Sequence, residues 1–128
     1  IDNTKFAMGL CVPQAFDRTT NDLIAFYRNT DSNLSVVVDA GSTEATASCA
    51  TNPGVTTNTK YRIVVDALNG ARFYINNALK ATVVATSLAQ ALPGMFFGVS
   101  LADEAGTTAI SNLWLGPVLI SHYDRLVV

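Results

Sequence analysis

Three short runs of β-forming residues, separated by two turn signals, constrain the fold of this chain more than any other feature. The runs are rich in β-branched and aromatic side chains and cover residues 61–66, 72–76 and 79–84. Asn69-Gly70 separates the first two runs, and Asn76-Asn77 separates the last two. Asn and Gly tolerate the positive φ angles that tight hairpins require. The pattern predicts a three-stranded antiparallel meander.

The rest of the chain has the same character, with short apolar runs broken by turn residues and no long helical period. Residues 87–92 fit one short helical turn, and residues 43–50 fit an edge strand. The other expected strands cover residues 5–12, 22–28, 34–39, 95–102, 109–115 and 118–128. The expected core includes Phe6, Phe26, Phe73, Met95, Phe97 and Val99. We therefore expect an all-β, antiparallel two-sheet sandwich of jelly-roll type, with about nine or ten strands in a single domain over residues 1–128.

Charge is scarce in this chain. Only 14% of its 128 residues are charged, against about 25% in typical soluble domains. The net charge is −2, and the eight cations are scattered along the sequence, which argues against nucleic-acid binding. Two interpretations stay open: an extracellular domain covered by Ser, Thr and Asn, or a subunit whose faces are buried in a larger assembly. No apolar run reaches the ~18 residues of a membrane span, and Ile at position 1 suggests a processed or partial chain.

The predicted meander resembles a known family. Residues 59–66 followed by residues 69–77 resemble the hairpin of concanavalin A-like lectin/glucanase, or laminin-G-like, jelly rolls. The chain departs from that pattern at Asn77, where the family usually has Gly. The resemblance covers about a third of the chain and implies a two-sheet sandwich with one concave face. Members of this family bind sugars, act as adhesion modules, or form capsid decorations and tail appendages of bacteriophages.

Catalytic patterns are not apparent in the sequence. Glycoside hydrolysis needs two carboxyl groups placed across the scissile bond, whereas the close acidic pair Asp103-Glu104 fits solvated loop charges better. His122, the single histidine, has no nucleophile motif beside it and fits a partly exposed strand position. We therefore expect a protein that is not an enzyme and needs no cofactor.

The candidate binding residues are polar residues of the expected turns and two aromatic residues of the expected strands. Asn29, Asp31 and Asn33 alternate oxygen-bearing side chains as calcium loops do, but an ordinary turn is the preferred interpretation. The candidate sugar-binding residues are Tyr74, Asn76, Asn77 and Trp114, with a core position as the alternative for Trp114.

Cys11 and Cys49 are the only cysteines, and they have no C-x-x-C spacing, which makes a zinc site improbable. Two buried thiols and one disulfide both remain open from the sequence.

Two functions follow as hypotheses. The preferred one is a non-catalytic structural or assembly module, an extracellular or virion component such as a capsid decoration or tail appendage. Its expected partners are other protein subunits, in a homo-oligomer or larger particle, with neither nucleic acid nor membrane. The alternative is a carbohydrate-binding or adhesion module that recognises glycans.

Overall fold

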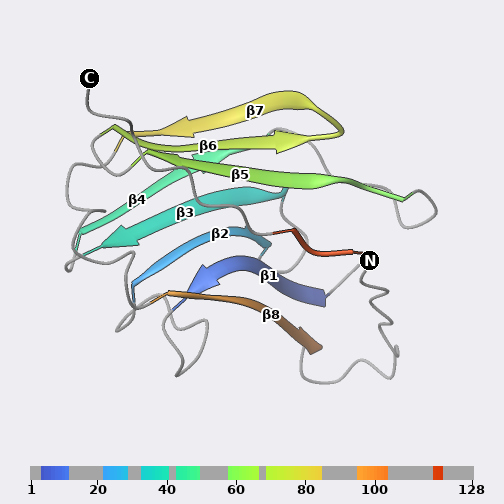
Figure 1. Ribbon diagram of the computed structural model, residues 1–128. Coiled ribbons are helices and arrows are strands. Elements are labelled where there is room, and N and C mark those ends of the chain that lie inside the picture. The colour runs from blue at the N-terminus through green and yellow to red at the C-terminus, as the bar shows by residue number, and fades with distance from the viewer. Residues whose placement is uncertain are drawn as a thin grey trace.

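The described part of the chain is built from β-strands. The computed structural model describes residues 4–11, 22–28, 33–40, 43–49, 58–66, 69–84, 95–103 and 117–119. No helix occurs within these ranges. The eight strands are β1 (Thr4–Cys11), β2 (Leu23–Arg28), β3 (Ser35–Ala40), β4 (Thr43–Ser48), β5 (Tyr61–Asp66), β6 (Gly70–Ile75), β7 (Ala78–Val83) and β8 (Phe96–Asp103) (Figure 1).

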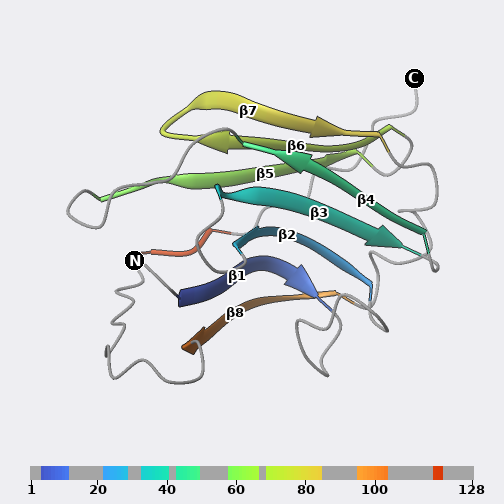
Figure 2. The ribbon, with the colours of Figure 1, turned by 180° about the vertical axis from the view of Figure 1, so that it is seen from behind.

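The strands form two sheets. One has the order β4-β3-β2-β1-β8, the other has the order β5-β6-β7, and every neighbouring pair is antiparallel. The smaller sheet lies over one half of the larger one, with β7 next to β4 and β6 next to β3 (Figures 1 and 2). This arrangement confirms the all-β prediction, the two antiparallel sheets and the three-stranded meander.

Some expected elements fall outside the described residues. They are the helical turn at 87–92, the strand at 109–115 and most of the strand at 118–128. Within that last range, Val118 and Leu119 are described, are exposed and are not in a strand.

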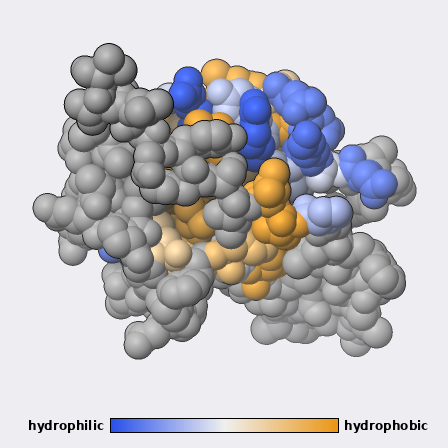
Figure 3. Space-filling view, viewed as in Figure 1, coloured by the Kyte–Doolittle hydropathy of each residue, from blue (hydrophilic) through white to orange (hydrophobic). Residues whose placement is uncertain are grey.

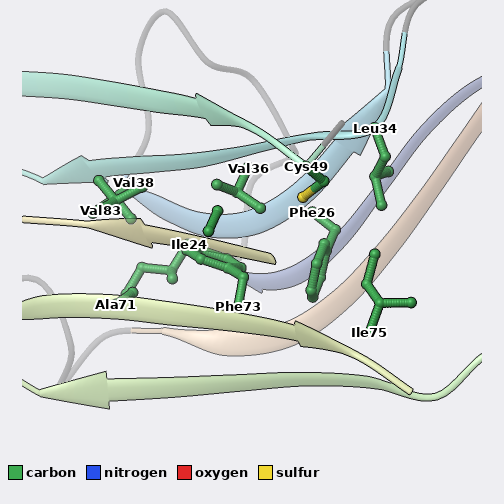
Figure 4. Close-up of a cluster of buried hydrophobic side chains, with 11 residues drawn as sticks. Ile24, Phe26, Leu34, Val36, Val38, Cys49, Ala71, Phe73, Ile75 and Val83 are labelled. Atoms are coloured by element: carbon green, nitrogen blue, oxygen red, sulfur yellow. The ribbon is translucent and has the colours of Figure 1, made fainter. Parts of the chain in front are cut away.

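The main core fills the space between the two sheets. Because successive side chains on a strand point to opposite faces, one set of alternate residues from each strand points inward. Phe26 lies in this layer beside Phe73 of β6 (Figure 4). Its ring meets the rings of Tyr61 of β5 and Phe73 edge-on, with centroids 5.0 and 5.2 Å away. The larger sheet contributes Ile24, Phe26, Leu34, Val36 and Val38, and the smaller sheet contributes Ala71, Phe73, Ile75, Ala81 and Val83.

The core prediction is confirmed for several residues. Phe26 and Phe73 are fully buried, and Met95 and Val99 pack against the main core. Phe97 is half-buried, whereas the side chain of Phe6 lies outside the described part of the structure.

The opposite face of the larger sheet is also buried at its centre. Leu23, Ala25 and Val37 form a second apolar cluster there, against which Tyr27 packs. The sequence of a strand that is buried on both faces is a continuous run of apolar residues rather than an alternation of apolar and polar ones. This explains the three consecutive valines of β3, Val36 to Val38, all of which are fully buried.

Gly9 allows β1 to approach β2 closely. It lies opposite Ala25 on one side and Gly98 on the other. A Cβ atom at this position would overlap the Ile24 carbonyl oxygen and would lie 2.6 Å from the Ala25 Cα. The neighbouring atoms are backbone, which cannot move aside as a flexible side chain could. Glycine is therefore required here by the spacing of the two strands.

We expect Gly9→Ala to destabilise the fold by about 1–3 kcal/mol, because the added methyl group has to push β1 and β2 apart. Urea unfolding followed by circular dichroism measures the change. Thr82→Ala, at an exposed position of β7, is the control and should change the free energy of unfolding by less than about 0.5 kcal/mol. Equal stabilities for Gly9→Ala and the unchanged chain would contradict the close approach.

Candidate functional site

The small sheet carries three of the candidate binding residues, with Tyr74 on its outer face and Asn76 and Asn77 in one of its turns. Arg62 of β5, Tyr74 of β6 and Leu79 of β7 lie opposite one another in the strand register and form one row across this face. The Arg62 guanidinium lies over the Tyr74 ring, with its Cζ 4.1 Å from the ring centroid. Leu79 is 53% exposed although it is a large apolar side chain. The row therefore combines a cation, an aromatic ring and an exposed aliphatic group on a flat surface.

The stacking of Arg62 on Tyr74 has a chemical consequence. A guanidinium over an aromatic ring is attracted to the negative face of the ring. The same contact occupies one face of the Tyr74 ring, the kind of surface on which a sugar ring would stack. A sugar ring stacking on that face of Tyr74 would have to displace the Arg62 guanidinium.

Asn76 and Asn77 form the tight turn between β6 and β7. Their φ angles are 50° and 67°, as a two-residue hairpin turn requires. The Asn76 backbone N–H donates to the Lys60 carbonyl oxygen at 2.8 Å, and the Lys60 N–H donates to Asn76 Oδ1 at 2.9 Å. The Asn76 side chain thus fastens the turn to the start of β5, which gives it a structural role. Asn77 is exposed.

The first turn of the meander differs in detail. The Asn69 N–H donates to the Asp66 carbonyl oxygen at 3.1 Å, and Asn69 Nδ2 donates to Asp66 Oδ2 at 2.7 Å. Of the Asn69-Gly70 pair, only Gly70 has a positive φ, of 111°. The predicted hairpin is confirmed, but its connection is longer than the pair alone, because Asp66 and Gly70 face each other at the end of the ladder.

The remaining candidates do not join this face in the described part of the chain. Trp114, Asn29 and Asp31 lie outside the described residues, and Asn33 is exposed immediately before Leu34 and β3. Among the described residues, no group of three or more His, Cys, Asp or Glu side chains is placed to hold a metal ion.

Three cations share the outer face of the small sheet. Strand alternation places Lys60, Arg62 and Arg72 on it, and all three are exposed. Figure 3 shows hydrophilic side chains over the region where β5, β6 and β7 lie in Figure 1. Asp66, the one acid among the described residues of the small sheet, accepts the hydrogen bond from Asn69. We call Lys60, Arg62 and Arg72 the basic face.

The basic face is not apparent from the sequence, along which its cations look scattered. Residues two apart on one strand, or opposite each other on neighbouring strands, share a face of a sheet even when they look dispersed along the chain. Residues 58–84 carry four cations and one acid, whereas the remaining chain carries four cations and nine acids. The small sheet is therefore +3 and the remainder −5, which gives the net charge of −2.

The two cysteines are free and buried, and they lie on different sides of the large sheet. Cys49 belongs to the main core between the sheets, whereas Cys11 lies opposite Leu23, which belongs to the second cluster on the far face. Burial raises the pKa of both thiols, and the charge of Lys80 partly offsets this rise at Cys49. Of the two alternatives that the sequence left open, a disulfide or two buried thiols, the structure has two thiols.

Tyr61 lies between the sheets with its phenol close to Cys49. Burial, and secondarily the neighbouring Cys49, raise the pKa of the Tyr61 phenol to about 12. Tyr61 is therefore an aromatic residue that packs against the main core.

Comparison with known proteins identifies no family. No family model, curated protein or solved structure shows a significant match to this chain. Among the described residues, no helix is long and apolar enough to cross a membrane.

Asn76→Ala should lower the free energy of unfolding by about 2 kcal/mol. The substitution removes the hydrogen bond to the Lys60 N–H, about 1 kcal/mol, and places a Cβ without a compensating side chain at positive φ, about 1 kcal/mol more. Chemical denaturation measures the loss.

The matched variant is Asn77→Gly, which should stay within about 0.5 kcal/mol of the unchanged chain because glycine suits the same φ. A smaller effect at Asn76 than at Asn77 would contradict the assigned roles.

Because the Tyr61 phenol is buried, we expect the folded chain to lose stability in alkali. The pKa of its phenol is about 12 in the folded chain and 10.0 in the unfolded one, so above pH 10.0 the unfolded state loses its proton first and becomes favoured. The contribution is fully present below pH 10.0 and disappears as the pH rises toward about 12. Denaturation midpoints measured across this interval should fall less steeply for Tyr61→Phe. Identical pH profiles would show that the Tyr61 phenol is not buried.

Proposed function

We propose that this chain is a non-catalytic structural module that assembles with other protein subunits as a virion component, such as a capsid decoration or tail appendage. The observation that carries the assembly role is the row Arg62, Tyr74 and Leu79 on the outer face of the small sheet. Tyrosine and arginine are enriched at protein interfaces and at their energetic hot spots. A flat strand face suits contact with another protein surface better than it suits enclosing a small molecule.

The other exposed apolar side chains support the same role. Val84, just after β7, is 73% exposed, and Leu119 is 89% exposed. Single exposed apolar residues are common on monomers, so the weight of this argument rests on the row rather than on these two residues. The charge-poor composition fits subunits whose surfaces are covered by neighbours.

The proposed fold is a jelly roll related to the concanavalin A-like family. The two-sheet sandwich is compatible with it, and so is the pairing of the late strand β8 with the first strand β1. Virion location and family membership are proposed on the resemblance of the β5–β6–β7 hairpins and on composition.

Carbohydrate binding is the second candidate, supported by the half-buried ring of Tyr74 beside the exposed Asn76 and Asn77. Against it, Arg62 covers one face of that ring, and the Asn76 side-chain oxygen is bonded to the Lys60 backbone.

Light scattering after size-exclusion chromatography tests the assembly role. We expect a mass above the 13.6 kDa of one chain, rising with concentration, and a lower mass for Leu79→Ser because the apolar contact is lost. A glycan array run in parallel separates the two candidates. A monomer at every concentration, together with glycan binding that Tyr74→Ala abolishes, would replace the assembly role with sugar recognition.

A further inference from the structure

The turn between β5 and β6 contains the one Asn-Gly pair of this chain, Asn69-Gly70. Every other asparagine in the sequence precedes a residue that has a side chain. Asn69 is exposed in the turn, and Gly70 is the first residue of β6. The φ angle of Gly70 is 111°, which residues with a Cβ atom rarely adopt. The conformation of the turn therefore requires a glycine directly after Asn69.

An asparagine that precedes a glycine can modify itself in water. The amide nitrogen of the glycine attacks the side-chain carbon Cγ of the asparagine and closes a five-membered imide ring. The Cγ–Nδ2 bond breaks, and Nδ2 leaves as ammonia with the proton that the backbone nitrogen loses. Water then opens the imide at one of its two carbonyls, which gives either aspartate or isoaspartate. A Cβ atom on the following residue hinders the attack, and glycine has none.

The position of the pair in the sheet favours this reaction. The Asn69 side chain is exposed, so water reaches the imide that it would form. Asp66 and Gly70 are the last facing pair of the β5–β6 ladder. The end of a ladder opens locally at a much lower free energy than its centre. The backbone at Asn69 and Gly70 can therefore reach the geometry of attack while the rest of the small sheet stays paired.

We propose that Asn69 is a site of spontaneous deamidation and that its product opens the turn between β5 and β6. The inference goes beyond the proposed assembly role and does not depend on it. Asn69 Nδ2 donates a hydrogen bond to Asp66 Oδ2 at 2.7 Å. Deamidation replaces this donor with a carboxylate oxygen, so two like charges meet where a hydrogen bond was. The charge of the small sheet falls from +3 to +2, because its acids increase from one to two.

The isoaspartate product also changes the main chain. It adds one methylene group to the backbone at residue 69, directly beside the facing pair Asp66 and Gly70. The turn connection sets the register of a hairpin, so a longer connection disturbs the pairing that begins there. The Asn76 side chain fastens the opposite end of the meander to Lys60. The loosening therefore begins at the Asn69 end of the small sheet.

Peptide mapping by mass spectrometry tests the reaction. The folded, unchanged chain is incubated at mildly alkaline pH, because base promotes the loss of the Gly70 amide proton. We expect a mass increase of about 1 Da in the peptide that contains Asn69, together with isoaspartate detected by an isoaspartyl methyltransferase. Asn77 is exposed in the other turn and precedes Ala78, so it is the internal control and should stay unmodified. Asn69→Ser should abolish both signals.

Variants of the turn test the effect of the product. Asn69→Asp introduces the carboxylate directly, and its urea midpoint should lie below that of Asn69→Ser, which places a neutral turn residue there. The gap between the two midpoints should narrow at about 500 mM salt, because exposed charges are screened. Asn69→Asp combined with Asp66→Asn exchanges the amide and the carboxylate. This double variant should recover the midpoint, because a donor and an acceptor face each other again.

Three results would overturn the proposal. If isoaspartate forms at Asn69 in the urea-unfolded chain but not in the folded one, the turn keeps the reacting groups apart and Asn69 is not a site in the folded protein. Equal modification of Asn69 and Asn77 would show that Gly70 does not decide where the reaction occurs. If Asn69→Asp and Asn69→Ser have the same midpoint at low salt, the new carboxylate does not open the turn.

Discussion

The contact of Phe26 with Tyr61 and Phe73 joins the two sheets, and the rest of the described structure depends on it. Phe26 comes from the middle strand of the large sheet, whereas its two partners come from neighbouring strands of the small one. Edge-to-face aromatic pairs contribute beyond the area they bury and also fix the angle between their rings. This cluster therefore sets how the meander sits on the large sheet, and so which of its faces is turned outward.

Once Phe26 fixes the inner face of the meander, strand alternation decides the outer one. Ile63, Phe73 and the residues in step with them point into the core, so Arg62, Arg72 and Tyr74 have to point away from it. The turn at Asn76 holds this register, because its side chain and backbone both bond to Lys60 at the start of β5. A slip by one residue would bury the arginines and expose the core. The outer row of Arg62, Tyr74 and Leu79 thus follows from the same register that builds the core.

The large sheet has a different constraint, because it is apolar on both faces at its centre. Strands β1 and β2 of this sheet lie close together at Gly9. A side chain at this position would collide with the backbone of β2. Its edge strand β4 alternates instead, with Ala45 and Ala47 inward and Glu44 and Thr46 exposed. Among the described side chains of the large sheet, Glu44 and Thr46 on this edge strand are exposed to solvent.

The sequence by itself determined the all-β class, the meander and most of the core, because periodicity and turn chemistry are local. Asn76-Asn77 and Gly70 identify turns through their φ preferences, and Phe26 and Phe73 are apolar residues inside strand patterns. Only the tertiary structure decided that Cys11 and Cys49 stay apart, that Arg62 covers Tyr74, and that scattered cations share one face. Those outcomes depend on which strands pair and which face turns inward, and such long-range pairings leave no signal in a single local stretch of sequence.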